Sequence, residues 1–228
     1  MNVILFGASG MVGTGALLEC LADARVARAL AVGRRPLGVQ HEKLDELIVD
    51  DFFDYAAVEQ RLVGYDACLF CLGVSSAGKS EAEYRHVTYD LTLAAAQTLA
   101  RLNPTMTFCY VSGAGTDSAE RSRQMWARVK GATENALARL PFKAVYLFRP
   151  GYIQPVKGAR SGTTLYRAFY AVLSPFYPIL QWALPGYVTT TETVGRAMIE
   201  AALHGAGQRV VASRAINGLA TRPPRGES

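Results

Sequence analysis

The sequence is poor in the residues from which metal and redox sites are built. Its 228 residues include only three histidines and four cysteines, and the histidines are scattered along the chain. The close pair Cys68 and Cys71 falls in an apolar run that predicts a strand, which would point the two side chains to opposite faces. No second Cys/His pair stands nearby to complete a ligand set. We therefore expect no metal site, and cysteines that pack as small apolar side chains.

Linkers, targeting segments and runs of one charge are also missing. The 24 Lys and Arg outnumber the 19 Asp and Glu, but the basic residues are dispersed among acidic ones, so no nucleic-acid partner is expected. With no Ser/Gly-rich boundary, we expect a single domain over 1–228 with a frayed tail at 221–228. Because the first apolar run starts at residue 2, it leaves no room for a leader. A cytoplasmic location is predicted.

Three glycines spaced three apart follow that first apolar run. Gly7 would let the chain reverse tightly, Gly10 would let the backbone approach a pyrophosphate, and Gly13 would let the next helix pack close to its strand. An Ala/Leu-rich segment with helical character follows, so the phosphate would meet unpaired N–H groups at a helix N-terminus. The pattern predicts a dinucleotide-binding turn.

The remainder of the chain alternates strand and helix. Apolar runs predict strands at 28–32, 46–49, 67–72, 107–111 and 144–148, and helices at 55–63, 81–102, 123–139 and 190–203. This order implies right-handed crossovers and an α/β fold with a doubly wound parallel sheet, the Rossmann fold, with ligands at the carboxyl ends of the strands.

The carboxyl end of the second predicted strand indicates which dinucleotide fits. NAD enzymes place an acidic residue there for the ribose hydroxyls, whereas this chain has Gly33 followed by Arg34 and Arg35. Two guanidinium groups suit a 2′-phosphate through charge-assisted hydrogen bonds. NADP(H) is favoured, with NAD(H) as the other option. The alternative is that the arginines only face solvent.

Asp51 and Phe52 follow the third predicted strand. The carboxylate could accept a hydrogen bond from the adenine amino group, and the ring could cover the adenine face. The alternative is an acidic loop residue that is solvated or caps the helix after Asp54.

Together these residues resemble the atypical short-chain dehydrogenase/reductase superfamily, near its NAD(P)-dependent epimerase/dehydratase-like and Tat-interacting-protein-like branches. The resemblance covers most of the chain. It rests on Gly7-x-x-Gly10-x-x-Gly13, Asp51-Phe52, Cys71-Leu72-Gly73, Tyr110-Val111-Ser112-Gly113-Ala114-Gly115, Lys130-Gly131-Ala132-Thr133-Glu134 and Arg149-Pro150-Gly151-Tyr152-Ile153.

The resemblance implies a set of cofactor contacts. Residues 8–12 would line the pyrophosphate, 71–73 the adenosine side, and 150–153 the nicotinamide. The cofactor-binding residues expected on all grounds are Gly7, Ala8, Ser9, Gly10, Met11, Val12, Gly13, Arg34, Arg35, Asp51, Phe52, Cys71, Leu72, Gly73, Lys130, Pro150, Gly151, Tyr152 and Ile153.

The superfamily's reaction centre combines a Ser, a Tyr and, four residues after the Tyr, a Lys. The Ser orients a carbonyl, the Tyr transfers the proton, and the Lys lowers the Tyr pKa and holds the nicotinamide ribose. Ser112 and Lys130 match this pattern, but Trp126 stands at the Tyr position. An indole N–H donates a hydrogen bond but is no proton acid or base near neutral pH.

Three interpretations remain open. Another hydroxyl could replace the missing one, with Tyr152 the first candidate catalytic residue and Tyr84 and Tyr89 behind it; each of these could equally line the core or cleft. The substrate could take its proton from solvent. Or the protein could bind NADPH without catalysis, as a regulatory or interaction module.

An apolar, aromatic segment within 155–190 is the last feature. Three prolines and an interior Arg and Gln in 165–185 argue against a membrane span. A substrate lid, a subunit interface of a homodimer, an interfacial membrane contact and an ordinary core helix pair remain as interpretations. Only a short segment follows the sixth predicted strand, so the substrate subdomain would be small and would hold a bulky nucleotide-sugar poorly. The leading hypothesis is therefore an NADP(H)-binding oxidoreductase-like protein acting on a small carbonyl or related compound.

Overall fold

A parallel sheet forms the centre of the protein in this computed structural model, which describes residues 1–156 and 186–222. Seven strands within these ranges lie in the order β3-β2-β1-β4-β5-β6-β9, every neighbouring pair parallel. In chain order they are β1 (Asn2–Phe6), β2 (Arg28–Gly33), β3 (Leu44–Ile48), β4 (Ala67–Phe70), β5 (Thr107–Val111), β6 (Ala144–Arg149) and β9 (Val210–Ala212). The predicted doubly wound parallel sheet is confirmed.

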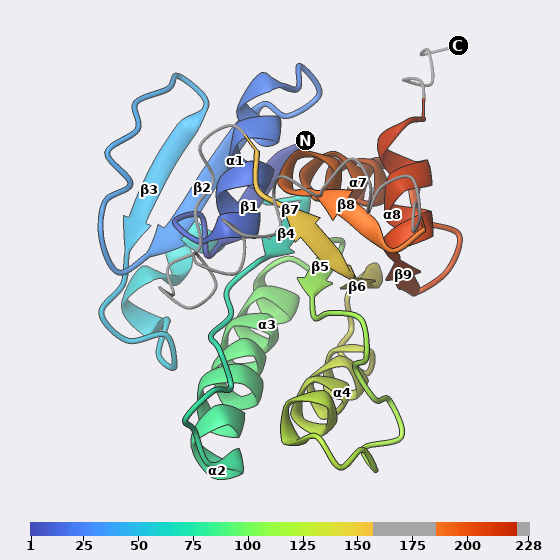
Figure 1. Ribbon diagram of the computed structural model, residues 1–228. Helices are drawn as coiled ribbons and strands as arrows, with labels where there is room; N and C mark the ends of the chain where they lie inside the picture. Colours follow the sequence, from blue (N-terminus) through green and yellow to red (C-terminus); the bar gives the residue numbers. More distant parts are fainter. Residues whose placement is uncertain (157–185, 223–228) are drawn as a thin grey trace.

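Helices cover both faces of the sheet (Figure 1). They are α1 (Met11–Ala22), the 3₁₀ helix η1 (Ala56–Leu62), α2 (Glu81–Arg85), the π turn η2 (His86–Asp90), α3 (Leu91–Leu102), α4 (Met125–Leu137), α7 (Thr191–His204) and α8 (Ser213–Ala220). On β1, Val3 and Leu5 pack toward α1, α7 and α8, whereas Ile4 and Phe6 pack toward α3 and α4. This alternation makes two cores from one strand.

The cysteines divide between the same two cores. Cys68 packs in the core on the α3 and α4 side, and Cys71, at the end of β4, packs against the other core. Burial raises the pKa of both thiols. Within the described ranges, no cluster of three or more His, Cys, Asp or Glu side chains could hold a metal ion.

Several elements differ from the sequence prediction. The helix expected over 81–102 contains the π turn η2 between α2 and α3, and the helix expected over 55–63 is the 3₁₀ helix η1. Apolar periodicity does not report such local changes in helix pitch. The prediction missed β9, α8 and a second parallel pair, β7 (Tyr152–Gln154) with β8 (Val188–Thr190). These strands have three residues each, too few for a period to show.

Helices α1 and α7 pack with their backbones close together. A Cβ added at Gly15 would stand 2.6 Å from Thr191 Cβ, and one added at Gly195 would stand 2.8 Å from Ala16 Cα. Next to this contact, the buried Glu19 carboxylate accepts a 2.8 Å hydrogen bond from Arg196. The glycines therefore set the distance at which α7 covers the sheet.

The Gly15→Ala substitution is expected to lower the free energy of unfolding by about 1–3 kcal/mol, because the added methyl group overpacks the α1–α7 contact. Gly218→Ala is the matched control, since Gly218 is an exposed helical glycine with no atom within 4 Å of its added Cβ. It should stabilise the protein by about 0.5–1 kcal/mol. Urea denaturation measures both changes, and equal midpoints for the two variants would refute the packing argument.

Candidate functional site

The turn between β1 and α1 depends on two of its three glycines for packing. Gly7 has φ of +80°, and a Cβ there would lie 2.7 Å from Leu72 N. A Cβ on Gly13 would lie 1.9 Å from Gly7 O. Gly10 is different, because its added Cβ would have only Gly7 O within 4 Å, at 3.2 Å. Protein packing thus excludes a side chain at Gly7 and Gly13, whereas a Cβ at Gly10 would make one tight contact, with Gly7 O.

The N-terminus of α1 can receive an anion. Gly10 is the N-cap, no side chain caps the helix, and its first turn has no acidic residue. The first N–H groups of an α-helix have no partner within the helix, and the helix dipole places partial positive charge there. Thr14 Oγ1 donates a 3.0 Å hydrogen bond to Ala8 O, which holds the turn against the helix.

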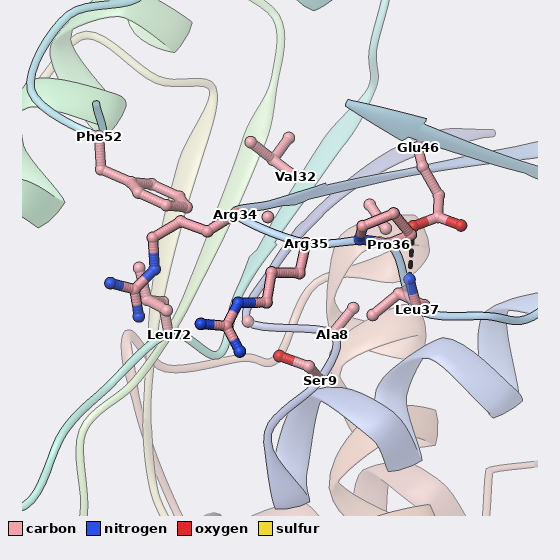
Figure 2. Close-up of a pocket in the computed structure, with 13 residues that line it drawn as sticks. Ala8, Ser9, Val32, Arg34, Arg35, Pro36, Leu37, Glu46, Phe52 and Leu72 are labelled. Carbon is pink, nitrogen blue, oxygen red and sulfur yellow. Dashed lines mark hydrogen bonds between the residues drawn. The ribbon is translucent and has the colours of Figure 1, made fainter. Parts of the chain in front are cut away.

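A cavity of about 680 Å³ opens beside this turn (Figure 2). It is lined by Gly7, Ala8, Ser9, Ala31, Val32, Gly33, Arg34, Arg35, Pro36, Leu37, Glu46, Phe52 and Leu72. The lining joins the ends of β1 and β2 with β3 and the segments after β3 and β4, which is the crevice expected at the carboxyl ends of parallel strands.

Arg34 and Arg35 give the cavity its positive charge. Both are exposed, and within the described part of the chain neither has a salt-bridge partner. Figure 2 shows the two side chains extending in the same direction from the loop after β2. The one acidic lining residue, Glu46, accepts a 2.8 Å hydrogen bond from Leu37 N. Glu46 was not among the residues predicted for the site, because it reaches the cavity only through the pairing of β3 with β2.

Of the residues predicted to contact the adenosine, some line the cavity and others do not. Phe52 and Leu72 line the cavity, and Phe52 packs on Phe6 with ring centroids 6.2 Å apart. Asp51, outside the lining, accepts a 2.8 Å hydrogen bond from Phe53 N. Cys71 turns its Sγ to Met198 Sδ, 4.0 Å away.

A buried carboxylate organises the region of Ser112. Ser112 Oγ lies 2.5 Å from Glu134 Oε1, to which it donates, and 3.2 Å from Phe148 O. Arg149 Nε donates to both carboxylate oxygens of Glu134, at 3.0 and 3.2 Å. Glu134 is 1% exposed, so the guanidinium balances a charge that burial would otherwise make costly. The sequence showed Glu134 only as part of a motif, because its partners are distant in the chain: Ser112 directly follows β5 and Arg149 ends β6.

Lys130 and Ser112 come together, as the motif predicted. Lys130 Nζ donates a hydrogen bond to Ser112 O. Burial lowers the pKa of this amine to about 8, while nearby Glu134 acts in the opposite direction. Trp126 lies one turn earlier on α4, and its ring edge would be 3.1 Å from a Cβ at Gly115.

The predicted nicotinamide contacts, residues 150–153, are not among the residues that line the cavity. Tyr152 begins β7, and its hydroxyl donates a 2.8 Å hydrogen bond to Gln154 Oε1. Gly151 N donates to Ser213 Oγ at 2.8 Å, and Pro150 O accepts from Ala114 N at 2.8 Å. Of the other tyrosines considered, Tyr84 is buried.

Two curated relatives align with nearly the whole chain. Protein HTATIP2 of Rattus norvegicus is 29% identical over 204 residues, covering 87% of this chain and 79% of its own. Protein fmp52, mitochondrial, of Emericella nidulans is 27% identical over 210 residues, covering 89% of this chain and 87% of its own. No protein-family model matches the chain.

Solved structures share the fold. An oxidoreductase of the short-chain dehydrogenase/reductase family from Burkholderia thailandensis has a TM-score of 0.65 at 17% identity, covering 96% of this chain and 92% of its own. The Bordetella bronchiseptica enzyme WbmF in complex with NAD+ also has a TM-score of 0.65 at 17% identity, covering 96% and 76%. These relatives and structural neighbours support the resemblance of the chain to the NAD(P)-binding atypical short-chain dehydrogenase/reductase superfamily, which its motifs indicated.

The predicted cytoplasmic location is wrong. The fungal relatives from Emericella nidulans and Aspergillus niger, aligned over 87% and 86% of their lengths, are named as mitochondrial proteins. The prediction rested on the early start of β1 and on free cysteines, and neither feature distinguishes cytosol from mitochondrion.

The aromatic segment expected to form a lid or interface, 165–185, and most of the wider range 155–190 lie outside the described residues, as do 223–228 of the predicted tail. Among the helices in the described ranges, none has the length and apolar character needed to cross a bilayer.

The lowered pKa of Lys130 predicts a pH-dependent stability. Below pH 8 the amine is protonated in the folded and unfolded chains alike. Between pH 8 and about 10.5 the folded protein has lost this proton while the unfolded chain still holds it, so stability rises with pH across this window. The difference in free energy of unfolding between the wild type and Lys130→Met should therefore shift in favour of the wild type by about 1–3 kcal/mol between pH 8 and about 10.5.

Urea denaturation of both proteins at pH 7, 9 and 10.5 measures this difference. Titration of the other groups affects the free energy of unfolding of both proteins equally and cancels in their difference. A constant difference across the three pH values would show that the Lys130 amine is not buried in the folded protein.

Proposed function

We propose that this protein binds NADP(H), in preference to NAD(H), and acts as an oxidoreductase on a small carbonyl or related compound. The observation that supports it best is the pair of arginines without salt-bridge partners in the described chain, lining the same cavity as the glycine turn. A 2′-phosphate is the part of NADP(H) that NAD(H) lacks, and guanidinium groups bind phosphate through paired N–H donors.

The residues of the cavity fit such a nucleotide. Gly10 leaves room for a close approach of phosphate, and the N-terminus of α1 supplies N–H groups. Phe52 and Leu72 offer apolar surface for an adenine. Gly33 stands where a carboxylate would repel a 2′-phosphate, and one oxygen of the Glu46 carboxylate, Oε2, accepts a hydrogen bond from Leu37 N.

The bound nicotinamide would supply or accept a hydride. Around it, the side chains expected to act are Ser112, Lys130 and Tyr152. The Ser112 hydroxyl donates its hydrogen bond to Glu134, and the Tyr152 hydroxyl donates to Gln154. Lys130 would hold a ribose hydroxyl through its amine. A proton would then come from Tyr152, after it leaves Gln154, or from solvent.

We also predict a single domain over 1–228 and a homodimer. Light scattering after gel filtration would test the homodimer by measuring its mass.

A second candidate, non-catalytic NADPH sensing, is favoured by one specific arrangement. Trp126 stands one turn before Lys130, and Ser112 donates to Glu134, so neither offers a transferable proton. A protein arranged in this way could bind the nucleotide and report its presence to a partner.

Nucleotide titration tests the binding proposal. Tryptophan fluorescence and energy transfer to the reduced nicotinamide should give a lower Kd for NADPH than for NADH. Arg34→Ala and Arg35→Ala should each weaken NADPH binding about tenfold or more and leave NADH nearly unchanged, because each removes charge-assisted bonds to the 2′-phosphate.

Arg28→Ala is the matched control, since Arg28 is an exposed arginine at the opposite end of β2, paired with Asp45. It should change neither Kd. If the wild type binds neither nucleotide, both candidate functions are refuted.

Trp126→Tyr separates the two candidates. With NADPH and a panel of small aldehydes and ketones, the new phenol one turn before Lys130 should raise kcat by at least tenfold, because a positioned acid contributes about 10²–10⁴-fold. Trp126→Phe, which has no hydroxyl, is the control. If wild type and Trp126→Tyr turn over a substrate equally well, Trp126 never limited the reaction. If no variant turns over any compound, sensing is the better account.

A further inference from the structure

Glu46 is an acidic residue in a cavity whose charge is otherwise positive. It comes from β3, in register with Ala31 of β2, and is half-buried. Its Oε2 accepts a 2.8 Å hydrogen bond from Leu37 N. Arg61 donates to the backbone O of Glu46, at 3.1 Å, and leaves the carboxylate alone. Within the described ranges the carboxylate forms no salt bridge.

The loop that carries the two arginines is hydrogen-bonded at one end to the residue after β3 and at the other end to β3 itself. At its start, Gly33 O accepts a 2.9 Å hydrogen bond from Val49 N. At its end, Leu37 N donates to Glu46. Between these points lie Arg34, Arg35 and Pro36, and no hydrogen bond joins the two guanidinium groups to the rest of the described chain. The conformation of the loop therefore depends on its two ends.

The carboxylate of Glu46 and the guanidinium groups of Arg34 and Arg35 point in different directions. Figure 2 shows the Glu46 carboxylate at Leu37 N, on the opposite side of Pro36 from the guanidinium groups, which extend away from it. An acid that formed salt bridges with the arginines would occupy the donors that a phosphate needs. Here Glu46 binds the loop through the backbone N–H of Leu37 and leaves the guanidinium donors available.

We propose that Glu46 is a positioning residue for cofactor selectivity, which fixes the arginine-bearing loop through its hydrogen bond with Leu37 N and so favours a 2′-phosphate. This inference rests on the proposed NADP(H) function. Selectivity would then depend on an acceptor atom at position 46 and not on its negative charge, because the carboxylate acts on the backbone and not on the guanidinium groups.

Two substitutions distinguish the acceptor from the charge. Glu46→Gln keeps an oxygen that can accept from Leu37 N and removes the charge, whereas Glu46→Ala removes both. The Kd ratio of NADH to NADPH should fall about fivefold in Glu46→Ala, mostly through weaker NADPH binding, as expected for one lost hydrogen bond. In Glu46→Gln the ratio should stay within twofold of the wild type.

Hydrogen–deuterium exchange of the nucleotide-free proteins gives a second readout. The Leu37 amide should exchange faster in Glu46→Ala than in the wild type and be unchanged in Glu46→Gln. An unchanged Kd ratio in Glu46→Ala, or a ratio altered equally in both variants, overturns the inference while a selective wild type keeps the proposed function. A wild type that does not prefer NADPH overturns the proposed function and this inference with it.

Discussion

The close contact of backbone with backbone at the end of β1 is the constraint on which the remaining structure depends. The first turn of α1 passes so near the Gly7 carbonyl that Gly13 has no room for a Cβ, and Gly7 itself lies against the backbone of Leu72. On its other side α1 meets α7 at Gly15 and Gly195. One helix is thereby fixed between the central strand and a second helix, and its N-terminus is aimed at the cavity.

The two halves of the candidate site differ in how far their polar groups are satisfied. In the cavity, the first N–H groups of α1 and the guanidinium groups of Arg34 and Arg35 remain available for an anion. Around Ser112, by contrast, the hydroxyl, Glu134 and Arg149 satisfy one another in a buried network. The first arrangement suits recognition of a charged ligand. The second suits rigidity, because breaking it would leave a buried charge unpaired.

Sequence reasoning succeeded where a signal is local and failed where it depends on pairing. The apolar runs identified β1, β2, β4, β5 and β6 because strands buried on both faces are nearly continuous in apolar residues. The three-residue strands β7, β8 and β9 were missed because they are held by neighbours and not by pattern. Glu46 and Glu134 were not singled out for a similar reason, since each is hydrogen-bonded to a residue in a distant part of the chain.

Neighbouring residues were enough to predict the sheet and the glycine turn, because apolar periodicity and the spacing of glycines are local properties of the chain. The sequence also placed Arg34 and Arg35 at the end of a strand, where parallel strands bring ligands. The contacts between distant segments showed that the arginines lack acidic partners in the described chain, that Glu46 accepts a hydrogen bond from the end of their loop, and that Ser112 donates a hydrogen bond to Glu134. The geometry of such contacts is set by how the strands pair and the helices pack.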